Sequence, residues 1–238
     1  MPRTIAENLA EIHARMAEAA LRGGRPPSAV RLVAVTKYAP LEAIEELLAA
    51  GCRDLGESRP QSLWERAPLF QDTSPPPNWH FIGQLQTNKI ERTLPLVSLV
   101  HSLDRWKLAE ALQAAAARQG RICQALIEVR LSDDPAKHGF WPEELPALLP
   151  RLANLPHLQI RGLMGMSGVN STEAEIRRQF LGLADLREIL QLTAPKNIQL
   201  AELSLGMTDD YEIGIECGAT LVRIGSGLFA GTTHAPRE

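Results

Sequence analysis

The sequence has few cysteines, no surplus of basic residues and no long apolar run, and each absence excludes a class of protein. The three cysteines, Cys52, Cys123 and Cys217, are far apart and odd in number, which argues against a disulfide framework or a cysteine metal cluster. The formal net charge of −3 at pH 7 lacks the basic excess of a nucleic-acid-binding protein. No apolar stretch approaches the length of a membrane span, and the N-terminal residues lack the apolar centre of a signal peptide. We therefore expect a cytoplasmic protein without bound metal, nucleic acid or membrane.

Short apolar runs alternate with amphipathic segments along all 238 residues. The runs predict strands, with helices between them. They cover residues 31–35, 52–55, 79–83, 97–102, 122–129, 158–164, 198–204 and 221–224. Strand–helix units in this number and chain length predict an α/β fold: a TIM (β/α)8 barrel forming a single domain over residues 1–238. The alternative is an open doubly wound sheet. Such a sheet typically has a Gly-x-Gly-x-x-Gly turn after its first strand, where this chain has Lys37-Tyr38-Ala39-Pro40.

Capping residues predict where several helices begin. Thr4 with Glu7 forms a capping box that starts an extra N-terminal helix ahead of the first strand. Thr172 with Glu175 forms a second one. We also expect Asp104 and Thr208 to cap the helices that follow them.

Lys37 lies just past the first apolar run, after Thr36, where a parallel strand presents its chemistry. A lysine half-removed from water would have a lowered pKa, which makes its free amine a usable nucleophile. The alternative is a strand-end lysine that simply reaches into solvent.

The turn Gly225-Ser226-Gly227 follows the last predicted strand, where barrels of this class commonly bind phosphate. Ser204 and Thr208, after the preceding strand, could supply hydroxyls to the same phosphate. Arg223 lies within the last strand, and a buried guanidinium needs an anionic or strongly accepting partner. That partner could be a core carboxylate or the ring nitrogen of a cofactor. A phosphorylated aldehyde held as an imine on Lys37 would use all these groups, and pyridoxal 5′-phosphate (PLP) has that form.

Several stretches resemble the pyridoxal phosphate homeostasis proteins, single-domain relatives of alanine racemase. They are Val33–Lys37, Trp79–Lys89, Arg161–Met164, Leu203–Asp210 and Val222–Ser226. The resemblance implies a barrel in which Lys37 holds PLP as a covalent Schiff base. It also implies that Arg223 lies near the pyridine nitrogen, with Ser204, Gly225 and Ser226 around the phosphate.

One position departs from the family pattern. Ser58 stands where the family usually has asparagine after Gly56-Glu57. We keep Ser58 and Thr208 among the candidate cofactor-binding residues, although a serine is shorter and has no amide. Met164 and Met166 end the sixth predicted strand; they could contact the cofactor or fill the barrel core.

We expect a PLP-binding protein that acts in intracellular PLP homeostasis or carriage, with indirect effects on amino-acid and keto-acid balance. Two alternatives stay open: a PLP-dependent amino-acid racemase and a cofactor-free Schiff-base aldolase. Racemization needs a second base. In the two-domain racemases, which this chain resembles, that base is a tyrosine of a C-terminal domain. The only tyrosines of this sequence are Tyr38 and Tyr211. We therefore expect no catalytic residues. Recipients would be PLP-requiring apoenzymes, and the chain would be a monomer or weak dimer.

Two further residues invite a functional interpretation. We expect His80 to be a packed, hydrogen-bonded core residue. Lys137, in the long loop after the fifth strand, could accept the cofactor during transfer or be a solvated lysine.

Overall fold

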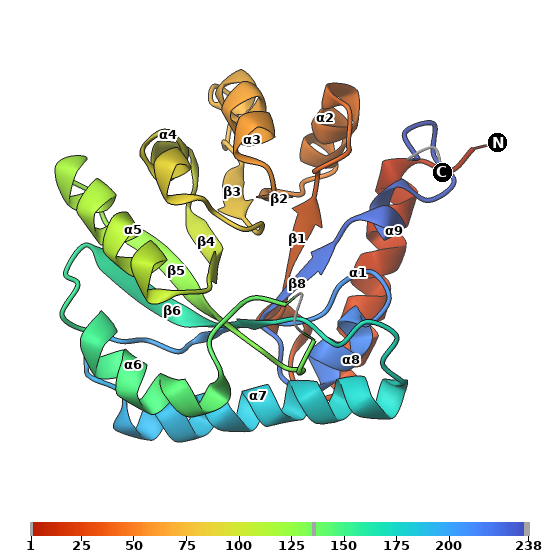
Figure 1. The fold of residues 1–238 in the computed structure, drawn as a ribbon. Helices are drawn as coiled ribbons and strands as arrows, with labels where there is room; N and C mark the ends of the chain where they lie inside the picture. The colour runs from red at the N-terminus through yellow and green to blue at the C-terminus, as the bar shows by residue number, and fades with distance from the viewer. Residues whose placement is uncertain (1, 135–136, 236–238) are drawn as a thin grey trace.

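Eight parallel strands form one closed barrel with helices around it (Figure 1). The computed structural model describes residues 2–134 and 137–235. The strands pair in sequence order, and β1 also pairs with β8. They are β1 (Arg31–Val35), β2 (Asp54–Glu57), β3 (Asn78–Phe81), β4 (Leu99–Leu103), β5 (Cys123–Val129), β6 (Leu158–Gly165), β7 (Glu202–Ser204) and β8 (Leu221–Ile224). The predicted TIM barrel is thus confirmed.

The helices form the outer layer of the barrel. They are α1 (Ile5–Arg22), α2 (Leu41–Ala49), α3 (Pro60–Arg66), α4 (Ile90–Thr93), α5 (Trp106–Arg118), α6 (Leu145–Leu152), α7 (Glu173–Thr193), α8 (Tyr211–Glu216) and α9 (Ser226–Phe229). Helix α1 lies beside α8 and α9, so the chain's first helix packs against its last ones (Figure 1). The side-chain amide of Asn8 donates to the carbonyls of Leu228 at 3.0 Å and Ala230 at 2.9 Å. The expected extra N-terminal helix is therefore present.

Capping predictions are confirmed at two helices and wrong at two others. Thr4 and Thr172 each form a complete capping box. Asp104 does not cap α5, because Arg105 occupies the cap position and Asp104 pairs with its guanidinium. Thr208 does not cap α8, which begins after Asp210, and its hydroxyl turns instead toward the β8 turn.

The seventh strand is shorter than its apolar pattern predicts. Only Glu202–Ser204 pair as a strand, although the apolar run begins at Ile198. Ile198 and Leu200 are still buried, at 3% and 2% exposure, because they pack in the main hydrophobic core. The apolar pattern here reports burial rather than sheet pairing.

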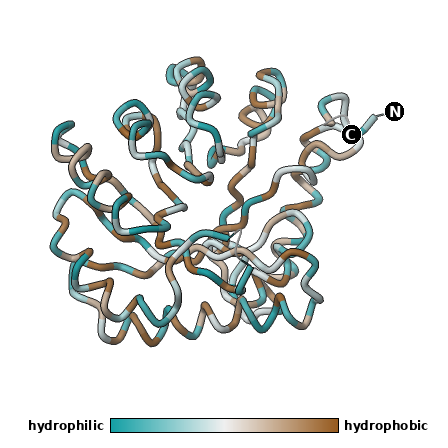
Figure 2. The backbone as a smooth tube through the Cα atoms, in the orientation of Figure 1, coloured by the Kyte–Doolittle hydropathy of each residue, from teal (hydrophilic) through white to brown (hydrophobic). Residues whose placement is uncertain are grey.

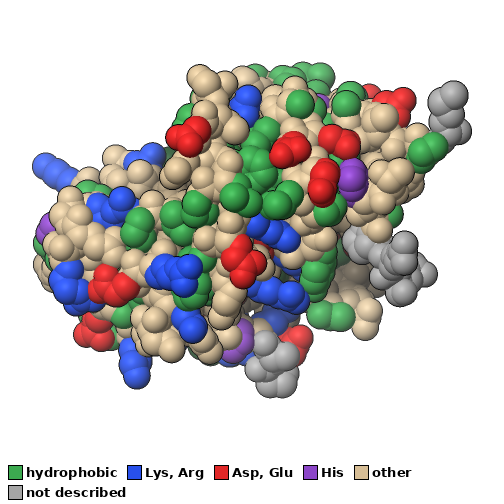
Figure 3. Space-filling view, turned by 90° about the horizontal axis from the view of Figure 1, so that it is seen from above, with side chains coloured by type: hydrophobic (Ala, Val, Ile, Leu, Met, Phe, Trp, Pro, Cys, Tyr) green, Lys and Arg blue, Asp and Glu red, His purple; other side chains and the backbone are tan. Residues whose placement is uncertain are grey.

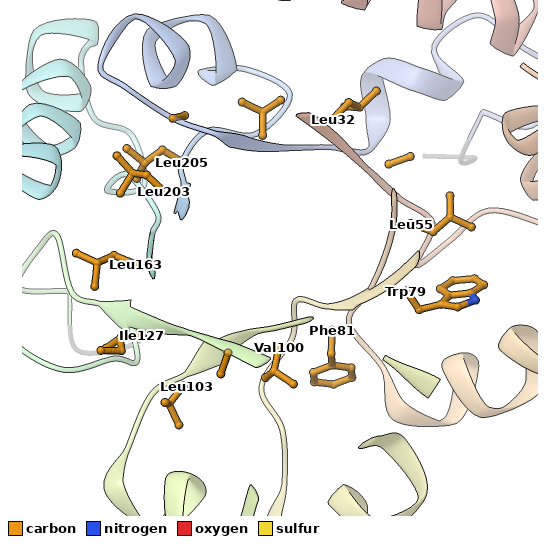
Figure 4. Packing of buried hydrophobic residues seen from close by; sticks show 14 of the residues in the cluster. Leu32, Leu55, Trp79, Phe81, Val100, Leu103, Ile127, Leu163, Leu203 and Leu205 are labelled. Atoms are coloured by element: carbon orange, nitrogen blue, oxygen red, sulfur yellow. The ribbon is translucent and has the colours of Figure 1, made fainter. Parts of the chain in front are cut away.

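The main hydrophobic core lies between the barrel and its helices. Side chains of the strands point outward from the barrel into this layer (Figure 4). Those labelled are Leu32, Leu55, Trp79, Phe81, Val100, Leu103, Ile127, Leu163 and Leu203, together with Leu205 directly after β7. Hydrophobic positions accordingly recur along the strands and intermittently along the helices (Figure 2). Burial of this apolar surface is the main source of stability.

The inside of the barrel is different, because its small apolar cluster shares the space with polar side chains. The cluster consists of Val33, Leu99, Leu126, Met164 and Leu221. His80, His101, Ser204 and Arg223 are also buried, each at 4% exposure or less. The barrel interior is therefore partly polar, and such groups need hydrogen-bond partners.

The face of the molecule shown in Figure 3 carries basic and acidic side chains intermixed. Among the described residues, no helix is both long and apolar enough to cross a membrane.

Candidate functional site

A cavity of about 500 Å³ opens at the carboxyl ends of β1 and β8, and we call it the mouth pocket. Its wall includes seven of the predicted site residues: Lys37, Ser58, Met166, Thr208, Arg223, Gly225 and Ser226. The wall also includes Tyr38, which was weighed only as a second base, and residues that sequence reasoning did not single out: Val35, Ala39, Ile82, Met207, Asp209, Phe229 and His234. Residues from both ends of the chain thus meet here because β1 pairs with β8.

The turn that carries Lys37 is held by Arg66 from α3. The Arg66 guanidinium donates to the carbonyls of Thr36 at 2.7 Å and Ala39 at 2.9 Å, on either side of the lysine. It also pairs with the Glu57 carboxylate at 2.7 Å, and the Glu57 side chain is fully buried. We call these contacts the Arg66 clamp. They anchor the backbone around Lys37 while leaving its side chain unconstrained.

Lys37 itself is exposed, in line with the alternative of a strand-end lysine that reaches into solvent. Its Nζ lies 5.1 Å from the centroid of the Tyr38 ring, and Arg59 approaches the same ring at 5.2 Å. Tyr38 is 61% exposed at the rim. The amine is therefore accessible both from solvent and from the pocket, so a ligand can reach it without passing through the protein interior.

The turn after β8 adds hydroxyl groups to the pocket wall. The Thr208 hydroxyl accepts from the Gly225 amide at 3.3 Å and from the Ser226 hydroxyl at 3.2 Å. A Cβ on Gly227 would lie 3.2 Å from the Thr208 methyl, so glycine permits this close approach. Two hydroxyls beside a glycine turn can supply hydrogen bonds to an anion.

Arg223 contributes a buried positive charge to the pocket wall. Its Nη1 donates to the carbonyl of Ser204 at 2.9 Å and to its hydroxyl at 2.5 Å, and Nη2 donates to Gly165 O at 3.1 Å. Burial lowers the pKa of Arg223 to about 10, while the carboxylates of Asp210 and Glu128 oppose this shift. The guanidinium is still charged at neutral pH, and its position is set by three hydrogen bonds.

Two predicted site residues lie behind the pocket wall. Ser204 is fully buried, and its hydroxyl contacts Arg223 and His101 inside the barrel. Met164 is 2% exposed and belongs to the interior apolar cluster. Both lie next to the site rather than on its surface. Met166, two residues after Met164, does line the pocket.

Ser58 lines the pocket and is fixed mainly through its backbone. Its amide donates to the Glu57 carboxylate at 2.9 Å. A Cβ on Gly83 would lie only 2.1 Å from the Ser58 carbonyl oxygen, so the turn after β3 packs directly on this residue. The Ser58 position is therefore tied to the Arg66 clamp through Glu57.

Two ionisable groups lie on the β5 side of the barrel: Glu128, which sequence reasoning did not single out, and Lys137, a candidate acceptor of the cofactor. Burial raises the pKa of Glu128 to about 7, helped by the Asp104 carboxylate and opposed by Arg223 and Lys137. Lys137 Nζ donates to the carbonyl of Met166 at 3.0 Å and to that of Ser167. Burial lowers the pKa of Lys137. Lys137 thus ties the β5 loop to the β6 loop and is not a freely solvated lysine.

Histidines of β3 and β4 meet inside the barrel. His80 Nδ1 lies 2.9 Å from His101 Nε2, which confirms the expectation of a hydrogen-bonded core histidine at position 80. Sequence reasoning did not single out His101. Period-two alternation could have found it, because Val100 points outward and its neighbour must then point inward.

The fold and the site together define a barrel of the alanine racemase type. Residues 4–233 match the family described as alanine racemase, N-terminal domain. Alanine racemase of Clostridium difficile shares the fold, with a TM-score of 0.68 at 14% identity over 88% of this chain and 52% of that chain.

More similar proteins narrow the assignment. The pyridoxal phosphate homeostasis protein of Pseudomonas aeruginosa is 41% identical over 97% of both chains. The protein of that name from Escherichia coli K12 is 34% identical over 98% of this chain and 99% of its own length. PipY of Synechococcus elongatus, solved with PLP bound, has a TM-score of 0.82 at 36% identity, covering 95% of this chain and all (100%) of that chain. The chain belongs to the pyridoxal phosphate homeostasis protein family.

Proposed function

We propose that this protein binds pyridoxal 5′-phosphate as a Schiff base on Lys37 and serves intracellular PLP homeostasis as a single-domain carrier. The observation that carries the proposal is the mouth pocket, where an accessible amine, a buried guanidinium and a hydroxyl-rich turn line one cavity of about 500 Å³. The PLP-bound PipY structure supports it independently.

The residues present fit the cofactor group by group. Bound PLP supplies an aldehyde that condenses with an amine and a pyridine ring that attracts electrons. Lys37 provides the amine, and Thr208, Gly225 and Ser226 would hold the phosphate. Arg223 would face the pyridine nitrogen. Its lasting charge disfavours protonation of that nitrogen, so the ring becomes a weaker electron sink.

Ser58 and Met166 would complete the contacts with the cofactor from the pocket wall. Ser204 and Met164 support the site from behind: Ser204 through its hydrogen bonds to Arg223, and Met164 by filling the barrel beneath it. We therefore assign the latter two an indirect role in binding.

We further propose that the site lacks efficient catalysis. Racemization needs one base on each face of the substrate. Tyr38 lies on the same side as Lys37, with its ring 5.1 Å from the amine. Tyr211 is 3% exposed and does not line the mouth pocket. Neither tyrosine in the described residues faces Lys37 across the pocket, so we expect the protein to hold PLP and pass it to apoenzymes that require it.

Removing the Lys37 amine tests the binding mode. The wild-type protein incubated with PLP should be yellow, and borohydride should bleach the colour by fixing the cofactor to the chain. Lys37→Ala should stay colourless, while Lys107→Ala, which removes an exposed lysine on α5, should behave as wild type. A yellow, borohydride-sensitive Lys37→Ala protein would show that another lysine is used.

Amino-acid racemization assays separate the carrier from a racemase. PLP-loaded protein should leave L-alanine without measurable conversion to D-alanine above a free-PLP control. Turnover in the enzymatic range, about 1 per second or faster, would contradict the non-catalytic proposal.

A further inference from the structure

Buried side chains inside the barrel form a continuous chain of hydrogen bonds that ends at Arg223. Asp54 Oδ1 lies 3.3 Å from His80 Nε2, and His80 Nδ1 lies 2.9 Å from His101 Nε2. His101 Nδ1 lies 3.0 Å from the Ser204 hydroxyl, which also accepts from Arg223 at 2.5 Å. Five strands contribute to it: β2, β3, β4, β7 and β8. It runs from the first residue of β2 across the barrel to the pocket wall.

Chemistry allows only one direction for these hydrogen bonds when each imidazole carries one proton. Arg223 can only donate, so the Ser204 hydroxyl accepts from it and has its own proton to give to His101. Burial, together with the nearby His80, Arg223 and Arg31, lowers the pKa of His101 well below its usual value, so this ring is neutral. His101 then donates from Nε2 to His80 Nδ1, and His80 donates from Nε2 to Asp54.

The reverse direction leaves two acceptors facing each other. If His101 donated from Nδ1 to Ser204, His80 would have to donate from Nδ1, and its bare Nε2 would face the Asp54 carboxylate. Burial favours the neutral form of Asp54, but hydrogen bonds from His80 and Asn78 and the charge of Arg31 lower its pKa overall. Asp54 is therefore an ionised acceptor at neutral pH, which excludes this arrangement.

We propose that Asp54, His80, His101 and Ser204 form a positioning relay that fixes and polarises Arg223, so that groups deep in the barrel act on a ligand they never touch. The proposal rests on the proposed function, because it assigns Arg223 to the cofactor ring. A group that donates a hydrogen bond becomes a better acceptor itself. The Asp54 carboxylate, at the far end of the relay, therefore strengthens the Ser204 hydroxyl as an acceptor for the guanidinium. The relay thus adjusts the charge facing the pyridine nitrogen without supplying any reacting group.

The ligand-free protein provides the first test. In ¹⁵N-histidine-labelled protein at neutral pH, ring nitrogen shifts should show both His80 and His101 as neutral and protonated at Nε2. His80→Gln and His101→Gln spectra would assign the signals. Protonation at Nδ1 of either ring, or a doubly protonated ring, would overturn the relay. This measurement involves no PLP, so it stands even if the proposed function fails.

The second test asks whether the relay acts on the cofactor. Ser204→Ala should weaken PLP binding about tenfold, the lower end of what losing a hydrogen bond to a charged group costs. Ser204→Ala and Asp54→Asn should both shift the pH midpoint of the visible absorption of bound PLP. Ser102→Ala should leave both quantities unchanged, since Ser102 is likewise a buried strand serine but lies on β4, donates to the Gly83 carbonyl and is outside the relay.

Circular dichroism would confirm that the variants are folded. If folded Ser204→Ala and Asp54→Asn had the absorption and affinity of Ser102→Ala, the relay would have no effect on the cofactor and the inference would be overturned. If wild-type protein bound no PLP at all, the proposed function would fail instead. If Ser204→Ala changed the affinity and the absorption but Asp54→Asn changed neither, Ser204 alone would position Arg223. That result would contradict the longer relay.

Discussion

Glu128 is a buried residue whose protonation affects stability near neutral pH. It is 6% exposed, and its pKa rises from 4.5 to about 7. The folded protein thus holds this proton more tightly than the unfolded chain does. Its contribution to stability is complete below about pH 4.5 and is lost as the pH rises through about 7.

Replacing this carboxyl should remove that pH dependence. The free energy of unfolding of Glu128→Gln, relative to wild type, should rise between pH 4.5 and 7 by at most about 3 kcal/mol and level off at higher pH. Urea denaturation across this range measures it, with exposed Glu110→Gln as the control. A Glu128→Gln curve parallel to wild type would mean that Glu128 titrates normally.

Individual residues also show how far the sequence alone could predict the site. Lys37 and Gly225-Ser226-Gly227 were predictable, because each follows a clear apolar run and barrels present chemistry at strand ends. The roles of Arg66 and Ser204 were not. Each depends on contacts between segments far apart in the chain, such as Arg66 with Thr36 and Ser204 with Arg223. The local sequence pattern does not show which side chains come into contact across a barrel.

At the scale of elements, the Arg66 clamp joins α3 to the turn after β1 and the end of β2. Arg66→Ala would leave the fully buried Glu57 carboxylate without its cation and two carbonyls without their donor. Unpairing a buried charge costs about 3–5 kcal/mol, and we expect about 3 because the Arg66 side chain is 18% exposed. Chemical denaturation measures the loss.

Arg118→Ala provides the matched comparison for the clamp. Arg118 pairs with Glu91, but both side chains are more than half exposed, at 63% and 52%. Exposed ion pairs contribute about 1 kcal/mol or less, so this variant should be nearly as stable as wild type. Equal losses in the two variants would show that the Arg66 pair is no more important than a surface pair.

Element boundaries were less predictable than element types. The strands and helices occur in the predicted order, but Thr208 does not cap α8 and β7 keeps only its last residues as strand. Thr208 has a cap's side chain, yet its hydroxyl accepts from Gly225, a residue of the next turn. A tertiary contact has overridden the local preference.

At the scale of the whole molecule, the barrel is closed, but neighbouring strands pair over unequal lengths. Strands β5 and β6 pair along nearly their full lengths, whereas β7 and β8 pair at Ser204 and Leu221. Local opening should therefore start between β7 and β8. In native-state hydrogen exchange, amides of β5 and β6 should exchange slowest, and those of β7 much faster. Equal protection around the barrel would contradict this order.

The partly polar interior of the barrel has a consequence for protein engineering. Filling the space of His80, His101 and Ser204 with well-packed aliphatic side chains would remove desolvated polar groups, a change that often raises thermal stability. The redesigned barrel would lose the support for Arg223 at the same time. Selection for heat resistance alone should therefore yield a barrel with fewer buried polar groups that binds its ligand less tightly.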